Sequence, residues 1–199
     1  RGRLKLVVGE HERLYPFPTN RKDRLTEALR LAILSDREQI HPALVSYLTG
    51  RGIDPAIART YCREVRYTIG GKEYFAVGFR NDAGGWELRS ARFKGGSSPK
   101  HITTLDNGSD MAMAFEGFID FLSYLSLKEP VTVDDSIVLN SVVNLHKAVS
   151  FFSRHRVVHA LLDNDDAGQK ALARLGESLP SSEVIDQSVF YRDHKYLNE

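Results

Sequence analysis

The feature that most constrains the fold is an alternation of short apolar runs and helical patterns in the second half of the chain. The runs are residues 111–115, 136–140, 156–162 and 183–186. Between them, apolar residues recur at i, i+3, i+4 and i+7, as in segments 118–125 and 145–152, the latter with Asn144 as its expected N-cap. Short strands that alternate with helices predict βαβ crossovers and a buried parallel sheet.

The first half has a different pattern. Stretches 63–69, 73–79 and 86–93 are rich in aromatic and β-branched residues, and turn signals at Gly70-Gly71 and residues 81–85 separate them, which predicts a β unit. Apolar spacing predicts helices over 25–33, from Pro42 to about Gly50, and from Pro55 to Cys62, the last with Asp54 as N-cap.

These patterns give an α/β fold of three parts. We expect an irregular segment over residues 1–20, a smaller α+β domain over 21–109, and a parallel sheet flanked by helices over 110–199. A loop over 94–100 and a turn-rich stretch over 105–110 mark the division.

Composition narrows the class of protein. The single cysteine, Cys62, excludes an intrachain disulfide framework and a cysteine-rich zinc site within these residues. No apolar run approaches the roughly 20 residues needed to cross a membrane, and no signal segment opens the chain. We therefore expect a cytoplasmic protein without a membrane partner.

The net charge of +1 conceals two opposite halves. Residues 1–109 carry 19 Lys and Arg against 12 Asp and Glu, whereas residues 110–199 carry 8 against 14. Such asymmetry favours a polyanionic partner for the first half, although solvated helix faces would produce the same count.

Three carboxylates follow predicted strands. Glu116 comes directly after the first strand of the second half, and Asp163 and Asp165 come directly after the third. Ligands of open α/β sheets bind outside the carboxyl ends of the strands, and hard oxygen ligands suit Mg²⁺ rather than Zn²⁺. Gly117 and Gly168 leave room beside the acids for a phosphate. The alternative is that the acidic run 163–166 only caps the next helix.

The segments FEGFIDFLSYL (115–125) and LLDNDDAGQKAL (161–172) together resemble the Toprim domain of bacterial-type primases, topoisomerases and several nucleases. The resemblance covers about 110–199. It implies that Glu116, Asp163 and Asp165 are metal-dependent catalytic acids, with Mg²⁺, or Mn²⁺ in its place, as cofactor. Asp120, one helical turn beyond Glu116, either joins the same face as a further ligand or is a solvated or capping acid.

The first half resembles primases. Segments 45–61 and 76–103 are similar to the region before the Toprim sheet in short primase-like proteins of mobile elements. The resemblance implies phosphate contacts from five basic residues: Arg80, Arg89, Arg92, Lys94 and Lys100. Trp86 either stacks a base or belongs to the core, and we favour the core. At the end of the chain, Tyr196 stands where the family usually has an acid, with Asp193 and Glu199 as candidate substitutes.

The implied function is metal-dependent primer synthesis, a nucleotidyl transfer on single-stranded DNA. The implied partners are the DNA template, nucleotides and a replicative helicase or other replication proteins. Two other classes stay open at this point: a Toprim-type nuclease or topoisomerase-related protein, and a DNA-binding module with weak catalysis.

Overall fold

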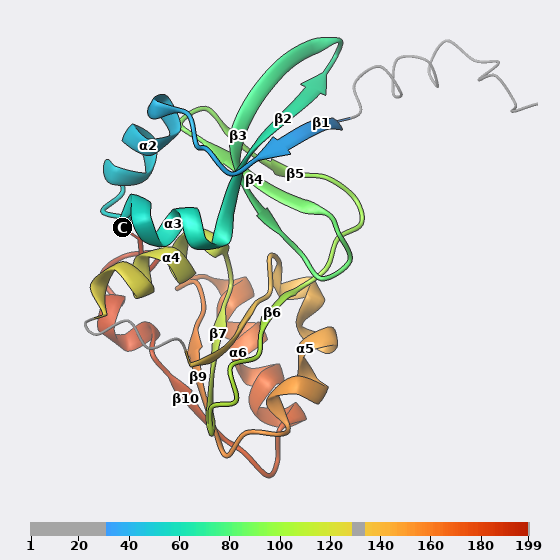
Figure 1. Cartoon of the computed structure of the whole chain (residues 1–199). Coiled ribbons are helices and arrows are strands. Elements are labelled where there is room, and N and C mark those ends of the chain that lie inside the picture. Colours follow the sequence, from blue (N-terminus) through green and yellow to red (C-terminus); the bar gives the residue numbers. More distant parts are fainter. Residues whose placement is uncertain (1–30, 129–133, 199) are drawn as a thin grey trace, which may run out of the picture.

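Two sheets, one above the other in Figure 1, form the framework of the protein, and the computed structural model describes residues 31–128 and 134–198. The first sheet is antiparallel and has the strand order β1-β2-β3-β4-β5; the second has the order β10-β9-β7-β8-β6. Helices flank the second sheet, so the expected α/β class with an α+β unit before it is confirmed. The predicted irregular segment over 1–20 lies outside the described residues.

The antiparallel sheet follows local signals in the sequence. Its strands are β1 (Ala32–Arg37), β2 (Cys62–Ile69), β3 (Lys72–Arg80), β4 (Trp86–Ser90) and β5 (Phe93–Gly96). The β2–β3 turn consists of Gly70 and Gly71, both with positive φ, between the paired residues Ile69 and Lys72. Glycine at both central positions is what the favoured two-residue hairpin requires.

Two helices lie between β1 and β2, and both begin where the sequence predicts. They are α2 (Pro42–Thr49) and α3 (Pro55–Tyr61). The Asp54 carboxylate accepts a hydrogen bond from the Ala56 N–H, so Asp54 is the N-cap of α3. Because Pro42 and Pro55 lack an N–H that a first turn would leave unpaired, they start helices at little cost.

Three expectations in the first half are wrong. Ala32 and Ile33, the end of the helix predicted over 25–33, pair with Thr68 and Tyr67 as part of β1, because the free edge of β2 satisfies their backbone groups; residues 25–30 lie outside the described part. The stretch 86–93 is not one strand but a hairpin, with Ser90 paired to Phe93. The predicted loop over 94–100 begins three residues late, because β5 continues to Gly96.

The second sheet is mixed, with one antiparallel edge. Its strands are β6 (Thr103–Leu105), β7 (Met111–Phe115), β8 (Asp135–Val138), β9 (Val157–Leu161) and β10 (Glu183–Asp186). β7, β8, β9 and β10 are parallel, whereas β6 pairs antiparallel with β8. β6 precedes the predicted division at 109/110 and still belongs to the second sheet.

Three helices connect the parallel strands: α4 (Phe118–Leu127), α5 (Leu145–Phe152) and α6 (Asp166–Ser178). α4 contributes to a core shared with the first sheet, and α5 and α6 pack on the other face of the second. Asn144 precedes α5 but does not cap it with its side chain, which donates to the Leu139 carbonyl instead. None of the described helices has the length and apolarity of a membrane span.

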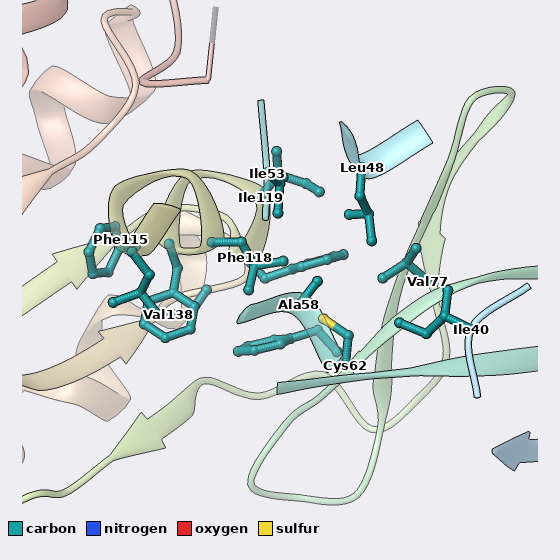
Figure 2. Close-up of a cluster of buried hydrophobic side chains, with 14 of the residues drawn as sticks. Ile40, Leu48, Ile53, Ala58, Cys62, Val77, Phe115, Phe118, Ile119 and Val138 are labelled. Carbon is teal, nitrogen blue, oxygen red and sulfur yellow. The ribbon is translucent and has the colours of Figure 1, made fainter. Parts of the chain in front are cut away.

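The core between the two halves is continuous (Figure 2). Leu48 of α2 and Val77 of β3 belong to the same buried cluster as Phe115 of β7 and Phe118 of α4. At its centre the rings of Phe79 and Phe118 stack, with centroids 5.2 Å apart and planes 6° from parallel. The first sheet and the second therefore meet across tightly packed aromatic side chains.

Candidate active site

A cleft of about 540 Å³ lies where the two halves meet at the carboxyl ends of β7 and β9. The chain passes from β7 to β8 on one side and then returns to β9 on the other side of β7. Such a reversal of strand order opens a crevice between the two strands, the usual ligand site of open α/β sheets. Glu116 follows β7, Asp163 lies two residues beyond β9, and both line the cleft.

Glu116 and Asp163 lie close together. A Glu116 carboxylate oxygen accepts a hydrogen bond from the Asp163 N–H at 3.3 Å. Burial, followed by repulsion from Glu116, raises the pKa of Asp163 to about 7. Burial also raises the pKa of Glu116, with smaller repulsive contributions from Asp165 and Asp120 and an opposing contribution from the Asp163 N–H. The pair is an acidic centre in which negative charge is costly.

Asp120 is a third carboxylate in the same cleft. It lies in the first turn of α4, is 9% exposed, and accepts a hydrogen bond from the Asn198 N–H at 3.2 Å. Burial raises its pKa despite that hydrogen bond and the nearby charges of Arg51 and Lys94. Asp120 thus lines the same cleft as Glu116 and is not a solvated acid, while its role as a metal ligand stays a prediction.

Asp165 has a different environment from the other acids. One of its oxygens accepts hydrogen bonds from the N–H groups of Ala167 and Gly168, which makes Asp165 the N-cap of α6. Its other oxygen lies 3.0 Å from the Lys195 ammonium. The Gly168 N–H and Lys195 lower the pKa of Asp165, and the residue is not among those that line the cleft. The capping alternative therefore describes what Asp165 does in this structure.

Gly168 has a packing role. A Cβ at this position would lie 2.0 Å from the Asp163 carbonyl oxygen, a distance that no side chain tolerates. Glycine therefore allows α6 to start directly against the backbone that carries Asp163.

The opposite wall of the cleft is basic. Arg89 and Lys94 come from the paired strands β4 and β5, and Arg92 lies in the turn between them. Arg89 is partly buried with its guanidinium 5.6 Å from the centre of the Phe118 ring, and burial lowers its pKa. Within the described part of the chain, none of these three residues forms an ion pair. Their positive charges therefore face the cleft opposite the acids.

Two predicted phosphate ligands lie elsewhere. The Arg80 guanidinium lies 5.7 Å from the centre of the Trp86 ring, and Lys100 forms a 2.8 Å ion pair with the buried Glu87. Neither residue lines the cleft. Trp86 is 6% exposed, as expected for a core residue.

Several cleft residues were not predicted. Tyr47 and Arg51 come from the α2–α3 region, and Asn140 follows β8 with a φ of 60°. Asn140 is the last residue of the strand predicted over 136–140; a polar residue at the carboxyl end of such a strand was the available signal, since asparagine tolerates the left-handed conformation. Tyr196 also lines the cleft, while Asp193 is exposed and not part of the lining; Glu199 lies outside the described residues.

The carboxylates of the cleft fit Mg²⁺ as a pair of ligands rather than as a complete set. Among the described residues, no group of three or more His, Cys, Asp or Glu side chains is arranged to hold a metal ion. Mg²⁺, however, is often held by one or two carboxylates, with water and substrate phosphates completing its shell. Glu116 and Asp163 offer such a pair of hard oxygen ligands, and their raised pKa values are what a cation between them would relieve.

Comparison with known proteins agrees with this architecture. Residues 113–199 match the family model described as Toprim-like. These residues form a Toprim-like domain. Residues 33–98 match a second model, described as a domain of unknown function (DUF8464). A search of curated protein sequences finds no significant match to the chain.

Among solved structures, the fold is similar to that of primases. The primase fragment of the bacteriophage T7 primase-helicase is 18% identical with a TM-score of 0.55, over 75% of this chain and 66% of that one. The Aquifex aeolicus primase, with its zinc-binding and RNA polymerase domains, is 17% identical with a TM-score of 0.55, over 73% and 49%. The chain thus spans two thirds or less of the length of these two structures. The likeness is one of fold, and the Toprim-like domain forms part of it.

Proposed function

We propose that the protein is a metal-dependent nucleotidyltransferase that synthesises primers on single-stranded DNA. One observation carries the proposal: a single cleft holds Glu116 and Asp163 on one wall and Arg89, Arg92 and Lys94 on the other. A growing nucleic acid and an incoming triphosphate both bring negative charge to the reacting centre. A site for them needs cations along the backbone and an acidic centre for metal at the reacting phosphate.

Each wall then has a task. The guanidinium and ammonium groups neutralise phosphates and fix their position, and Arg89 is the most confined because it packs against Phe118. Glu116 and Asp163 hold Mg²⁺, or Mn²⁺, which when bound supplies charge stabilisation at the transferred phosphate. As a carboxylate that lines the cleft, Glu116 is also our candidate to exchange a proton with the attacking hydroxyl.

Asp165 has a secondary role in this proposal. Its carboxylate reaches the metal only by exchanging Lys195 for the cation, so in the described state it orients α6 and the backbone beside Asp163. The proposal places the protein in the cytoplasm with template DNA, nucleotides and a replicative helicase as partners. Support for nucleic acid and nucleotides as partners comes from a solved T7 structure, 18% identical with a TM-score of 0.52, in which primase domains are bound to an RNA/DNA hybrid and dTTP.

The decisive experiment supplies single-stranded DNA, labelled nucleotides and either Mg²⁺ or Mn²⁺. Products that lengthen with time, and that disappear in Glu116→Gln and Asp163→Asn, are expected. Shortened DNA without incorporation would instead establish a Toprim-type nuclease. DNA binding with neither product would leave a binding module.

Asp106→Asn is the matched control. It makes the same change from carboxylate to amide at an exposed residue that pairs with Arg154, outside the cleft. Its product yield should equal that of the unchanged protein.

A further inference from the structure

A second hollow, of about 750 Å³, lies on the other side of the β4–β5 hairpin from the cleft. Aromatic side chains dominate its lining: Tyr67, Tyr74, Phe75 and Phe93. It forms where β3 extends beyond β4, since β4 pairs with β3 only from Val77 to Arg80. The hollow therefore lies beside an open strand edge.

The aromatic rings form a layered surface. Tyr67 is buried and stacks on Tyr74, with centroids 5.7 Å apart, and lies 5.0 Å from the Phe93 ring. Tyr74 and Phe75 are 45% and 39% exposed. Tyr67 is the cross-strand partner of Tyr74 and covers one side of its ring. Phe75, the next residue of β3, points to the other face of the sheet, where its ring lies 4.9 Å from that of His41. The open aromatic surface on the side of Tyr67 and Phe93 is therefore that of Tyr74.

The hollow and the basic cleft lie on either side of the same hairpin tip. The residues 90–93 line both, so the tip of the β4–β5 hairpin is a ridge between them. Arg92 lies on this ridge, is exposed, and forms no ion pair among the described residues. On the aromatic side the exposed carboxylate of Glu73 lines the hollow. A phosphate is therefore favoured on the ridge and disfavoured beside Glu73.

We propose that Tyr74, on the Tyr67 side of this hollow, stacks a base of the single-stranded DNA whose backbone crosses Arg92 into the cleft. Single-stranded DNA carries flat bases on an anionic backbone, and here an aromatic hollow lies beside the cation Arg92. Stacking on aromatic side chains tolerates any base and is a common source of affinity for single strands. The inference rests on the proposed function, since it gives the template strand a path beyond the cleft.

The experiment measures binding of a fluorescently labelled single-stranded oligonucleotide that contains 2-aminopurine, whose emission falls on stacking. Tyr74→Ala should weaken binding at least about five-fold and reduce the quenching, whereas Phe75→Ala, on the other face of the sheet, should change both signals less. Tyr74→Leu, which keeps apolar area but not the ring, should behave like Tyr74→Ala. Tyr74→Trp should restore both signals, which separates loss of stacking from loss of folding.

Phe190→Ala is the matched control, because this ring is 83% exposed and lies outside both hollows. If the unchanged protein binds the oligonucleotide and the Tyr74→Ala variant binds it equally well, the inference is wrong and the proposed function stands. In that case the part of β3 that β4 does not cover would instead be a candidate edge for pairing with a peptide strand. If the unchanged protein does not bind single-stranded DNA, both proposals fail.

Discussion

The side chain of Asn198 joins Arg51 to the Toprim-like domain. Its amide donates a hydrogen bond to the Arg51 carbonyl at 2.8 Å and another to the Ser123 hydroxyl, and its oxygen accepts one from the Arg51 guanidinium. Asn198 also donates its backbone N–H to Asp120. One residue near the end of the chain thus ties a cation and an acid of the cleft to each other.

Removing this amide should affect Arg51 in particular. Asn198→Ala is expected to lower the free energy of unfolding by about 1–2 kcal/mol, because the buried Ser123 hydroxyl and the exposed Arg51 lose their hydrogen bonds to the amide. In a double-mutant cycle on single-stranded DNA binding, Asn198→Ala and Arg51→Ala should be coupled by about 1 kcal/mol. Strictly additive effects would show that Asn198 does not position Arg51.

Lys94, which lines the cleft, and Lys100, which pairs with Glu87, should respond differently to substitution. Lys94→Ala is expected to reduce the salt dependence of DNA binding by about one phosphate contact and to leave stability unchanged. Lys100→Ala should do the reverse, because it removes the partner of the buried Glu87 and costs about 1 kcal/mol of stability. Titrations at several salt concentrations, together with urea unfolding, distinguish the two. An equal loss of salt dependence in both variants would return Lys100 to the phosphate-binding set.

Two glycines of α6 provide a matched pair. Gly168→Ala should lower stability by about 1–3 kcal/mol, because the new methyl group collides with the Asp163 carbonyl, and it should reduce primer synthesis by moving that backbone. Gly176→Ala meets no atom within 4 Å and should raise stability by up to about 1 kcal/mol. Thermal unfolding of the two variants checks the contrast, and a harmless Gly168→Ala would contradict the close packing.

Asp163 should make the metal-free protein less stable as the pH rises. The pKa of Asp163 is about 7 in the folded state against an ordinary 3.8. As the pH rises, Asp163 therefore ionises in the unfolded chain before it ionises in the folded protein, and this ionisation stabilises the unfolded state. The cost therefore grows from about pH 4 to about pH 7 and then stays constant. Asp163→Asn should raise the free energy of unfolding near pH 8 and change it little near pH 4. Urea unfolding in a chelating buffer measures this, and a gain that does not depend on pH would contradict the shifted pKa.

Local patterns predicted much of the fold because they act within a few residues. The Asp54-Pro55 pair starts α3, and Gly70-Gly71 forms the β2–β3 turn, as their chemistry requires. The failure at Ala32 and Ile33 has the opposite cause: their helical spacing lost to pairing with β2, a strand some thirty residues away.

The residues of the candidate site likewise divide into those that local patterns could place and those that depend on distant contacts. Glu116 and Asp163 could be placed together because the ends of parallel strands meet at one edge of a sheet. Arg51 could not be placed there, since its position depends on Asn198, 147 residues later in the chain. Nor does the sequence reveal that Lys100 is engaged by Glu87, because that contact depends on how the first sheet is paired.

The stacked rings of Phe79 and Phe118 have a consequence for how the protein can be divided. Phe79 belongs to the half that carries the cations, and Phe118 follows Glu116 by two residues in the half that carries the acids. A fragment cut at the predicted division near residue 109 would therefore expose half of an aromatic interface. Neither fragment would hold the cleft, because its lining cations Arg89 and Lys94 and its lining acids Glu116 and Asp163 lie on opposite sides of the cut.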